Sequence, residues 1–366
     1  MTFYGIMVKC DNKLVNMDKI NLNQISQLIS QKLGKNIVIT NIEPAGSGYH
    51  SDGFKLTTQA GQRFFIKRVK SHDLGFEFPE RKIYSLLVSD GMGKRVNLSP
   101  KPIGVILTNQ DQGYILPDID DNTAIYHVQE YEDFDSSYSQ KLQAKKDQGK
   151  SEIDQQDIKE LEKVVELLSK IHAIKHPVSD PQRLKALYND SLRNVISNPE
   201  LTLVLLQSFP ADHLILPRQA HKDYLGLMLN QVYKWENRYD RLSALHGDCW
   251  GANLFFKQDK VYKIDFSRMP WGDPGVDVGW WLSQYIWLYH ETRNEYFKEL
   301  GEKFLQLYEQ KTGDREIREA VAIILGLLGI INLTPLFYQN LNLDIAKSFY
   351  NHIIKVLEAG KFSWPQ

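Results

Sequence analysis

The chain has 366 residues, of which 42% are hydrophobic and 24% are charged, a balance typical of globular proteins with a sizeable core. Its formal net charge of −1 gives no electrostatic reason to expect binding to nucleic acid or to an anionic membrane surface. Two cysteines are too few for a disulfide framework, so we expect a reducing compartment, the cytoplasm.

The N-terminal third of the sequence predicts a small antiparallel sheet. A short amphipathic helix is predicted first, over residues 21–34, because its apolar side chains fall on one face. Four β-rich runs separated by turn residues follow: NIVITNIEP, GFKLTTQAGQRFFIKRV, IGVILTNQDQGYIL and AIYHVQEY. The run EFPERKIYSLLVSDG, between the second and the third of these, predicts one inserted helix.

The character of the sequence changes after Tyr131. Residues 132–158 are polar and rich in Lys, Gln and Asp, which predicts a solvated linker. Helical patterns then dominate up to residue 360, with one β-rich interruption before residue 277. We therefore expect two domains, a β-rich one over residues 1–131 and a mainly helical one over residues 132–366.

One uncharged segment, AVAIILGLLGIINLTPLFY at residues 320–338, approaches the length that spans a bilayer. Asn332, Thr334 and Pro335 lie within it, and no basic flank marks one of its sides. We interpret it as a buried core helix that ends before Pro335, and we expect no membrane association.

The stretch ALHGDCWGANLFF, residues 244–256, is the strongest candidate for chemistry. It places Asp248 and, five residues later, Asn253 in a short loop between apolar flanks. This spacing is typical of loops for phosphoryl transfer, in which the aspartate orients or deprotonates the acceptor hydroxyl and the asparagine oxygen binds Mg²⁺. The run VYKIDF follows and ends near Asp265, a second oxygen ligand for a metal that bridges nucleotide phosphates.

The N-terminal sequence contains a matching set of residues for the nucleotide. Lys67 in FFIK lies on a predicted strand, where a lysine would contact the α- and β-phosphates. A turn before it contains Gly46, Ser47 and Gly48, and glycines there permit close approach of the main chain to phosphate oxygens. Glu80, in the inserted helix, would pair with Lys67. Each residue alone has an ordinary explanation, such as a hairpin turn or a surface charge, but their order favours a nucleotide site.

These residues resemble the aminoglycoside phosphotransferase and choline kinase-like family, which has the bilobal protein-kinase-like fold. The resemblance covers residues 38–290 and rests on four runs: LHGDCWGANLFF, YKIDF, GDPGVDVGWWL and LLSKIHAI. It implies an α+β fold with a small antiparallel β-sheet lobe that contains one helix, and a larger, mainly helical lobe. It also implies ATP and Mg²⁺ as cofactors.

The resemblance implies a role for each matching residue. Asp248 resembles the catalytic base, and Asn253 and Asp265 resemble the metal ligands. Lys67 and Glu80 resemble the phosphate-binding lysine and its partner. Two further residues would support the loop: His246 resembles its structural histidine, and Asp277 resembles the buried acid that braces it.

The sequence departs from the family pattern in three places. Ser51 stands where a third glycine of the phosphate loop is expected, and Phe266 and Ser267 follow the second acid in place of Phe–Gly. Asp273 comes so soon afterwards that no activation loop fits between them. We therefore expect a small acceptor rather than a protein.

The connector YHVQEYED is the expected place for the adenine ring of the nucleotide. Its contacts would be made mainly through main-chain atoms of Gln129, Glu130 and Tyr131. The alternative interpretation of these three residues is the ordinary end of a strand.

Five of the seven tryptophans lie between residues 250 and 287. Aromatic faces suit sugar rings and cations, whereas tryptophans on a helix are more often core. Trp250 and Trp271 lie in loops, so we expect them at the acceptor, together with Asp273, which suits an ammonium or sugar hydroxyls.

The sequence thus predicts an ATP-dependent phosphotransferase, a kinase that acts on a hydroxyl of a small polar molecule, a sugar or amino sugar first. Two alternatives stay open: a catalytically silent, kinase-like binding or scaffold protein, and a kinase for a protein or lipid-linked acceptor. The oligomeric state is also open, with a monomer among the options. An assay of nucleotide consumption with amino sugars, sugars and choline distinguishes the phosphotransferase from the catalytically silent binding protein.

Overall fold

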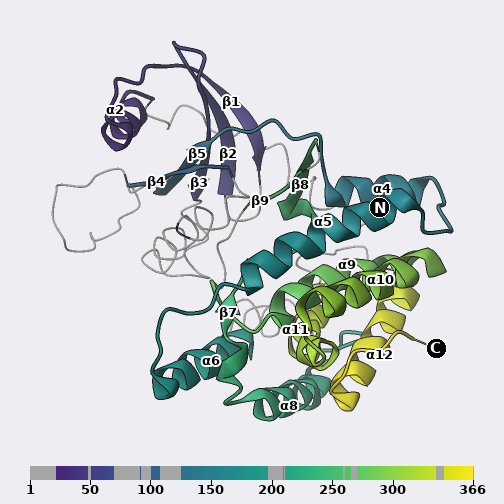
Figure 1. The fold of residues 1–366 in the computed structure, drawn as a ribbon. Helices are drawn as coiled ribbons and strands as arrows, with labels where there is room; N and C mark the ends of the chain where they lie inside the picture. The colour runs from purple at the N-terminus through teal and green to yellow at the C-terminus, as the bar shows by residue number, and fades with distance from the viewer. Residues whose placement is uncertain are drawn as a thin grey trace. The chain divides into compact units, whose positions relative to one another are not determined.

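The chain divides into two compact units, residues 1–134 and residues 135–366, a division close to the change in sequence character after Tyr131. The structure is a computed structural model, drawn in Figure 1. It describes residues 22–47, 51–69, 91, 100–107, 125–196, 209, 211–258, 260–264, 270–334 and 342–365.

The first unit contains a five-stranded sheet with the strand order β1-β2-β3-β5-β4. Every pairing within it is antiparallel. The predicted strands and the first predicted helix are confirmed, and their bounds are α2 Leu22–Leu33, β1 Ile39–Ser47, β2 Ser51–Thr58, β3 Arg63–Val69, β4 Pro102–Leu107 and β5 Ile125–Glu130. The inserted helix predicted over residues 77–91 lies, except for Gly91, outside the described residues.

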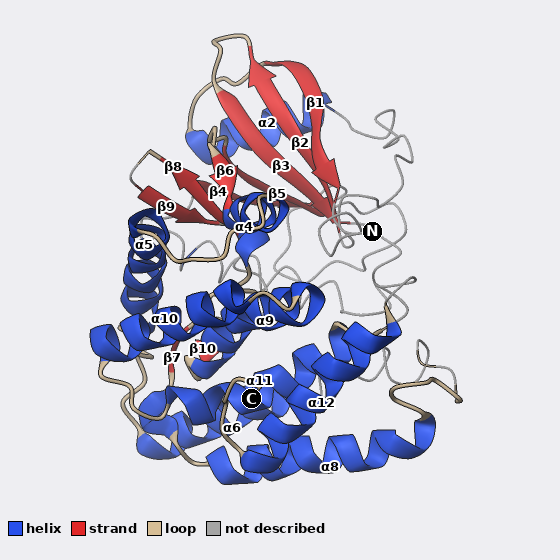
Figure 2. Ribbon diagram, turned by 90° about the vertical axis from the view of Figure 1, so that its right-hand side faces the viewer, coloured by secondary structure: helices blue, strands red, loops and turns tan. Residues whose placement is uncertain are grey.

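Alternating apolar side chains build the core of this unit. Phe54 and Leu56 on β2 and Phe64 and Ile66 on β3 point to one face of the sheet and are fully buried. Helix α2 packs its own apolar stripe against the same core, as its position in Figure 2 shows. The period-two pattern in the sequence therefore determines which face of the sheet is covered.

The second unit is mainly helical (Figure 2). Its helices are α4 Tyr138–Asp147, α5 Gln155–His172, α6 Pro181–Ile196, α8 Arg218–Trp235, α9 Gly275–Thr292, α10 Glu295–Thr312, α11 Ile317–Ile331 and α12 Leu343–Ala359. Its short strands are β6 Ser136–Ser137, β7 Ser243–Ala244, β8 Leu254–Lys257, β9 Lys260–Lys263 and β10 Trp271–Gly272. They form two small sheets, β6-β8-β9 and β10-β7.

Helix α11 lies at the centre of the second unit, between α9 and α12. Nearly all of its side chains are buried, and the helix ends at Ile331, so the prediction of a core helix that stops before Pro335 is confirmed. Within the part of the chain that the structure describes, no helix has both the length and the apolar character needed to traverse a membrane.

The prediction of a solvated linker over residues 132–158 is wrong. The stretch contains β6, α4 and the start of α5, and α4 begins with a capping box made by Ser137 and Gln140. Its lysines are not solvated charges, because Lys145 lies 2.8 Å from Asp157 and 2.6 Å from Glu160, two acids on α5. The lysines of α4 thus form ion pairs with α5, whereas other polar residues of the stretch, such as Gln148 and Glu152, are exposed.

Candidate functional site

The loop predicted to carry the chemistry connects β7 to β8. Gly247 has φ +81°, a left-handed conformation that glycine adopts without strain, and it turns the chain just before Asp248. The loop ends in a 3₁₀ turn, η5 Gly251–Asn253, in which the amide of Asn253 donates to the carbonyl of Trp250 at 3.0 Å. The predicted loop between apolar flanks is confirmed, and β8 after it pairs with β9 in an antiparallel hairpin.

Asp248 and Asn253 are hydrogen-bonded to each other. The Asn253 Nδ2 atom donates to Asp248 Oδ2 at 3.1 Å and to the Asp248 carbonyl at 3.0 Å. Both side chains are half-buried. Since the amide nitrogen is used inside the loop, the amide oxygen is the atom of Asn253 that suits a hard cation such as Mg²⁺.

Asp277, in the first turn of α9, braces the main chain of this loop. Its Oδ2 accepts a hydrogen bond from the amide of His246 at 2.7 Å, and its Oδ1 accepts one from the amide of Gly247 at 2.8 Å. Burial opposes its ionisation, but the hydrogen bond from His172 and the charge of Lys263 hold its pKa at about 2. Asp277 is therefore an ionised, fully buried anchor.

His246 links the same loop to the strand that follows it. Its Nδ1 accepts a hydrogen bond from the amide of Asp248 at 3.2 Å, and its Nε2 donates to the carbonyl of Ile264 at 2.7 Å. The two contacts select the neutral tautomer with the proton on Nε2. The histidine thus orients the residue at which chemistry is predicted without needing a charge.

A buried hydrogen-bond chain extends this support to α5 and α10. His172 at the end of α5 donates from Nε2 to Asp277 Oδ2 at 3.1 Å. The hydroxyl of Tyr308 on α10 donates to His172 Nδ1 at 2.7 Å. Sequence reasoning missed Tyr308, because nothing in the spacing of α10 relates it to a histidine 136 residues earlier.

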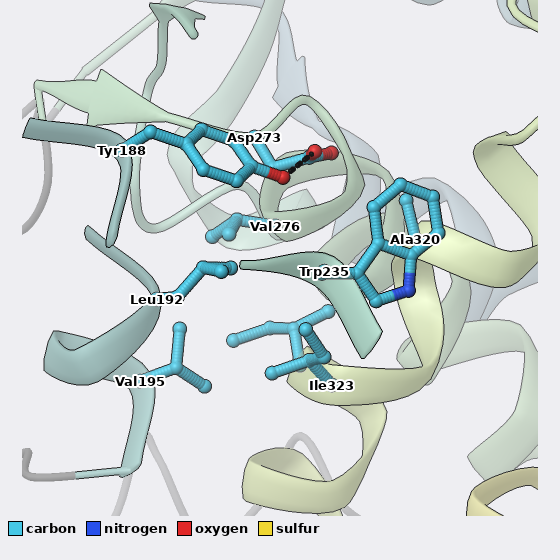
Figure 3. A pocket seen from close by; sticks show the side chains of 9 residues that line it. Tyr188, Leu192, Val195, Trp235, Asp273, Val276, Ala320 and Ile323 are labelled. Carbon is cyan, nitrogen blue, oxygen red and sulfur yellow. Dashed lines mark hydrogen bonds between the residues drawn. The ribbon is translucent and has the colours of Figure 1, made fainter. Parts of the chain in front are cut away.

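Asp273 is held inside the protein. Its carboxylate accepts from Arg241 Nε at 2.7 Å, from Arg241 Nη2 at 3.0 Å, from the Tyr188 hydroxyl at 2.8 Å and from the Gly275 amide at 2.7 Å. Only 4% of the residue is exposed. Figure 3 shows the contact with Tyr188 at the edge of a small, mainly apolar pocket.

This geometry gives Asp273 a structural role in place of the predicted contact with the acceptor. Burial alone would raise the pKa of Asp273, but the charge and hydrogen bonds of Arg241 lower it. The carboxylate is thus already paired with a cation of the chain. Sequence reasoning missed Arg241, whose 32-residue separation from Asp273 leaves no local pattern.

Of the two tryptophans predicted in loops, Trp250 lies in the loop after β7 and Trp271 lies on the short strand β10. Trp250 and Trp271 are half-buried, and the Trp271 ring lies edge-on to the His176 ring with centroids 4.6 Å apart. Burial lowers the pKa of His176, and the charge of Arg183 adds to the effect. Trp271 also pairs with β7 at the start of the loop. The tryptophans interpreted as core are buried at two of three positions, 281 and 287, and half-buried at 280.

The predicted nucleotide residues that the structure describes lie in the first unit. Lys67 is on β3, opposite Gly53 on β2 and His127 on β5. Gly46 and Ser47 end β1.

The connector residues form strand pairings and main-chain hydrogen bonds within the first unit. Gln129 pairs with Phe65, the amide of Glu130 donates to the carbonyl of Lys101 at 2.8 Å, and the amide of Tyr131 donates to the carbonyl of Arg63 at 3.1 Å. The predicted adenine contact would therefore require main-chain atoms other than these two amides.

Three of the predicted residues, Gly48, Glu80 and Asp265, lie outside the described residues. The Lys67–Glu80 ion pair and the second metal ligand therefore stay predictions. Within the described part of the chain, no group of three His, Cys, Asp or Glu side chains could hold a metal. The oxygen of Asn253 remains a suitable ligand, because Mg²⁺ is often bound by only one or two protein oxygens.

Comparison with known proteins adds a family and a fold. Residues 41–320 match a family described as "Phosphotransferase enzyme family". No curated protein sequence matches the chain significantly.

Solved structures resemble this one at low sequence identity. An amicoumacin kinase, hAmiN, in complex with AMP-PNP, Ca²⁺ and Ami has 13% identity and a TM-score of 0.59, over 93% of this chain and 94% of that one. A thermostable mutant of aminoglycoside phosphotransferase APH(4)-Ia has 13% identity and a TM-score of 0.51, over 92% and 99%. Choline kinase LicA from Streptococcus pneumoniae has 15% identity and a TM-score of 0.50, over 92% and 99%. The bilobal, kinase-like α+β fold is thereby confirmed.

Proposed function

The chain belongs to the phosphotransferase enzyme family, and from that premise we propose that it transfers the terminal phosphoryl group of ATP to a hydroxyl of a small polar molecule, a sugar or amino sugar first. The observation that carries the proposal is the hydrogen-bonded pair of Asp248 and Asn253 in a loop braced by Asp277. Phosphoryl transfer depends mainly on positioning and charge stabilisation, and both require a rigid loop.

The chain's own groups have separate tasks in this reaction. Asp248 would accept a hydrogen bond from the acceptor hydroxyl, orient its oxygen toward the terminal phosphorus and take its proton. Lys67, supported by Glu80, would bind the phosphates, with the main chain at Gly46–Gly48 around them. Asn253 and Asp265 would hold Mg²⁺, which when bound neutralises charge on the phosphate oxygens.

The acceptor would lie beside two tryptophans. Trp250 and Trp271 are half-buried, so each leaves part of its ring surface for a sugar. Asp273 is left out of this proposal, because its carboxylate is paired with Arg241. The cytoplasm, the compartment predicted from the low cysteine content, supplies both ATP and Mg²⁺.

The test is a nucleotide-consumption assay with amino sugars, sugars and choline as acceptors. We expect turnover with at least one acceptor, and we expect Asp248→Ala to lower kcat by about 10²–10⁴-fold while nucleotide binding persists. The matched control is Asp190→Ala, which removes an acid on the surface of α6. Equal turnover for Asp248→Ala and the control would refute the assignment, and no ATP consumption by the unaltered protein would favour the silent binding protein.

A further inference from the structure

Three buried side-chain atoms around the catalytic loop have no hydrogen-bond partner among the described residues. They are Oγ of Ser139 on α4, and Oε1 and Nε2 of Gln284 on α9. Ser139 is 4% exposed and Gln284 is 2% exposed. Because buried polar groups are normally hydrogen-bonded, these atoms indicate a partner other than the residues that the structure describes.

Two of these atoms, Gln284 Oε1 and Ser139 Oγ, lie beside Gly251, the first residue of η5. A Cβ atom at this position would lie 2.5 Å from Gln284 Oε1, 2.9 Å from Ser139 Oγ and 3.0 Å from the Ser139 amide nitrogen. These distances are too short for a side chain at residue 251, so the glycine lets both polar side chains lie directly against the main chain there. Asn253, the proposed metal ligand, lies at the other end of the same 3₁₀ turn.

The helical periodicity of α9 explains why Gln284 lies beside Gly251. Asp277 and Gln284 are seven residues apart, so they lie on the same face of the helix. Asp277 holds the start of the loop through the amides of His246 and Gly247. Gln284 contacts the loop four residues further on, at Gly251. The catalytic loop therefore runs along one face of α9, with a polar side chain at each end.

We propose that Ser139 and Gln284 are positioning residues for the catalytic loop, and that one buried water molecule joins their side chains to the main chain at Gly251. A buried water molecule needs two to four polar partners, and an amide and a hydroxyl together provide donors and acceptors for it. Ser139 also lies in the first turn of α4, where main-chain amides have no partner inside the helix.

The proposal deepens the proposed function and rests on it for its catalytic consequence. A fixed η5 turn holds the amide oxygen of Asn253 in place for the metal, and outer groups that orient a metal ligand affect metal affinity strongly. Loss of the bridge should therefore weaken Mg²⁺ binding during turnover more than it weakens nucleotide binding.

The first experiment needs no activity. Amide hydrogen exchange over residues 246–254 is compared between the unaltered protein, Gln284→Met and Ser139→Ala. Both variants remove a polar partner and keep the local volume similar, and we expect exchange in this loop to become about tenfold faster in each. The control is Ser283→Ala on the same helix, whose hydroxyl bonds only within α9, to the Trp280 carbonyl at 2.8 Å.

The second experiment measures the Mg²⁺ dependence of turnover. In Gln284→Met and Ser139→Ala we expect the half-saturating Mg²⁺ concentration to rise about 10- to 100-fold, with a smaller change in KM for the nucleotide. Ser283→Ala should retain both values. If Gln284→Met fails to fold, Ser139→Ala provides the same test.

Two outcomes overturn the proposal. The first is loop exchange and Mg²⁺ dependence that match the control in both variants. The second is a variant that becomes more stable with unchanged exchange, because the polar atoms would then be unsatisfied groups that an apolar substitution relieves. If the unaltered protein transfers no phosphate, the proposed function fails, whereas the exchange experiment still decides whether Ser139 and Gln284 fix the loop.

Discussion

Arg241 of the second unit is a buried charge whose guanidinium is paired with two carboxylates. Arg241 is the last residue of the 3₁₀ turn η4 Tyr239–Arg241. It is 8% exposed and forms ion pairs with Asp273 and with Asp314. Its Nη1 and Nη2 atoms donate to the two oxygens of Asp314 at 2.8 Å each. Burial disfavours the charged guanidinium, but the two carboxylates raise its pKa above the ordinary value. The segment that contains Trp271 is thereby tied to the start of α11.

Replacing this arginine should destabilise the protein strongly. In Arg241→Met, Asp273 and Asp314 stay buried without their cation, and we expect a loss of about 3–5 kcal/mol in the free energy of unfolding. Arg241→Lys should recover little of it, since an ammonium cannot reproduce the planar fork. The control is Arg193→Met on α6, which breaks an exposed pair with Asp190 and should cost about 1 kcal/mol or less. Urea unfolding measures all three, and equal losses for Arg241→Met and Arg193→Met would contradict the argument.

Pairs of helices in the second unit approach closely where a glycine faces a partner. Gly279 on α9 would place a Cβ atom 2.1 Å from Ile324 Cγ2 on α11. Ile324 is β-branched and held in a helix, so its side chain has little freedom to move away. The absence of a side chain at residue 279 thus permits the contact between α9, whose Asp277 braces the loop at His246 and Gly247, and the central helix α11.

The same substitution should have opposite effects on two helices. Gly279→Ala should lower the free energy of unfolding by about 1–3 kcal/mol, because the new methyl group overpacks the contact with Ile324. Gly226→Ala in the middle of α8 meets nothing within 4 Å and should raise stability by up to about 1 kcal/mol through helix propensity. Thermal unfolding followed by circular dichroism distinguishes the two. A stabilised Gly279→Ala protein would show that the α9–α11 contact is looser than the structure indicates.

Over the whole molecule, patterns within one element could be predicted and contacts between elements could not. Phe54 and Leu56 alternate with polar residues, so β2 and its buried face follow from the sequence. Helix α4 was missed because Lys145 is neutralised by Glu160, 15 residues later. The same applies to Asp273, whose partner Tyr188 is 85 residues away.

The bracing role of Asp277 came only from the family resemblance, since no spacing links it to the amides of His246 and Gly247. The spacing of residues within one loop was therefore enough to identify Asp248 and Asn253 as candidates. Spacing did not identify the buried charges that support the loop.

The C-terminal segment joins four helices of the second unit. The amide of Phe362 donates to the carbonyl of Arg318 on α11 at 2.6 Å, and Trp364 fills the space beside Gly301 on α10. His352 on α12 donates from Nε2 to the carbonyl of Ser363 at 2.7 Å. His290 on α9 in turn donates from Nε2 to His352 Nδ1 at 3.1 Å.

Both histidines are held in the neutral form by this arrangement. The Ser348 hydroxyl donates to His290 Nδ1 at 2.9 Å, so every ring nitrogen already has its role as donor or acceptor. Burial lowers the pKa of His290 to about 3, and the charge of Arg293 adds to the effect. Burial also lowers the pKa of His352. A proton added to either ring would meet a donor that already points at it.

The stability of the protein should therefore fall in mild acid. The pKa of His290 is lower in the folded state than in the unfolded chain, so the unfolded state binds more protons below about pH 6.5. The contribution of neutral His290 to the free energy of unfolding is fully present above that pH, and it is lost as the pH falls toward 3. We expect His290→Gln to show a smaller drop in Tm between about pH 7.5 and about pH 5 than the unaltered protein, since an amide gains no proton. His221→Gln on α8, outside this hydrogen-bonded set, is the control and should keep the full drop. Equal drops in all three proteins would show that other groups cause the acid sensitivity.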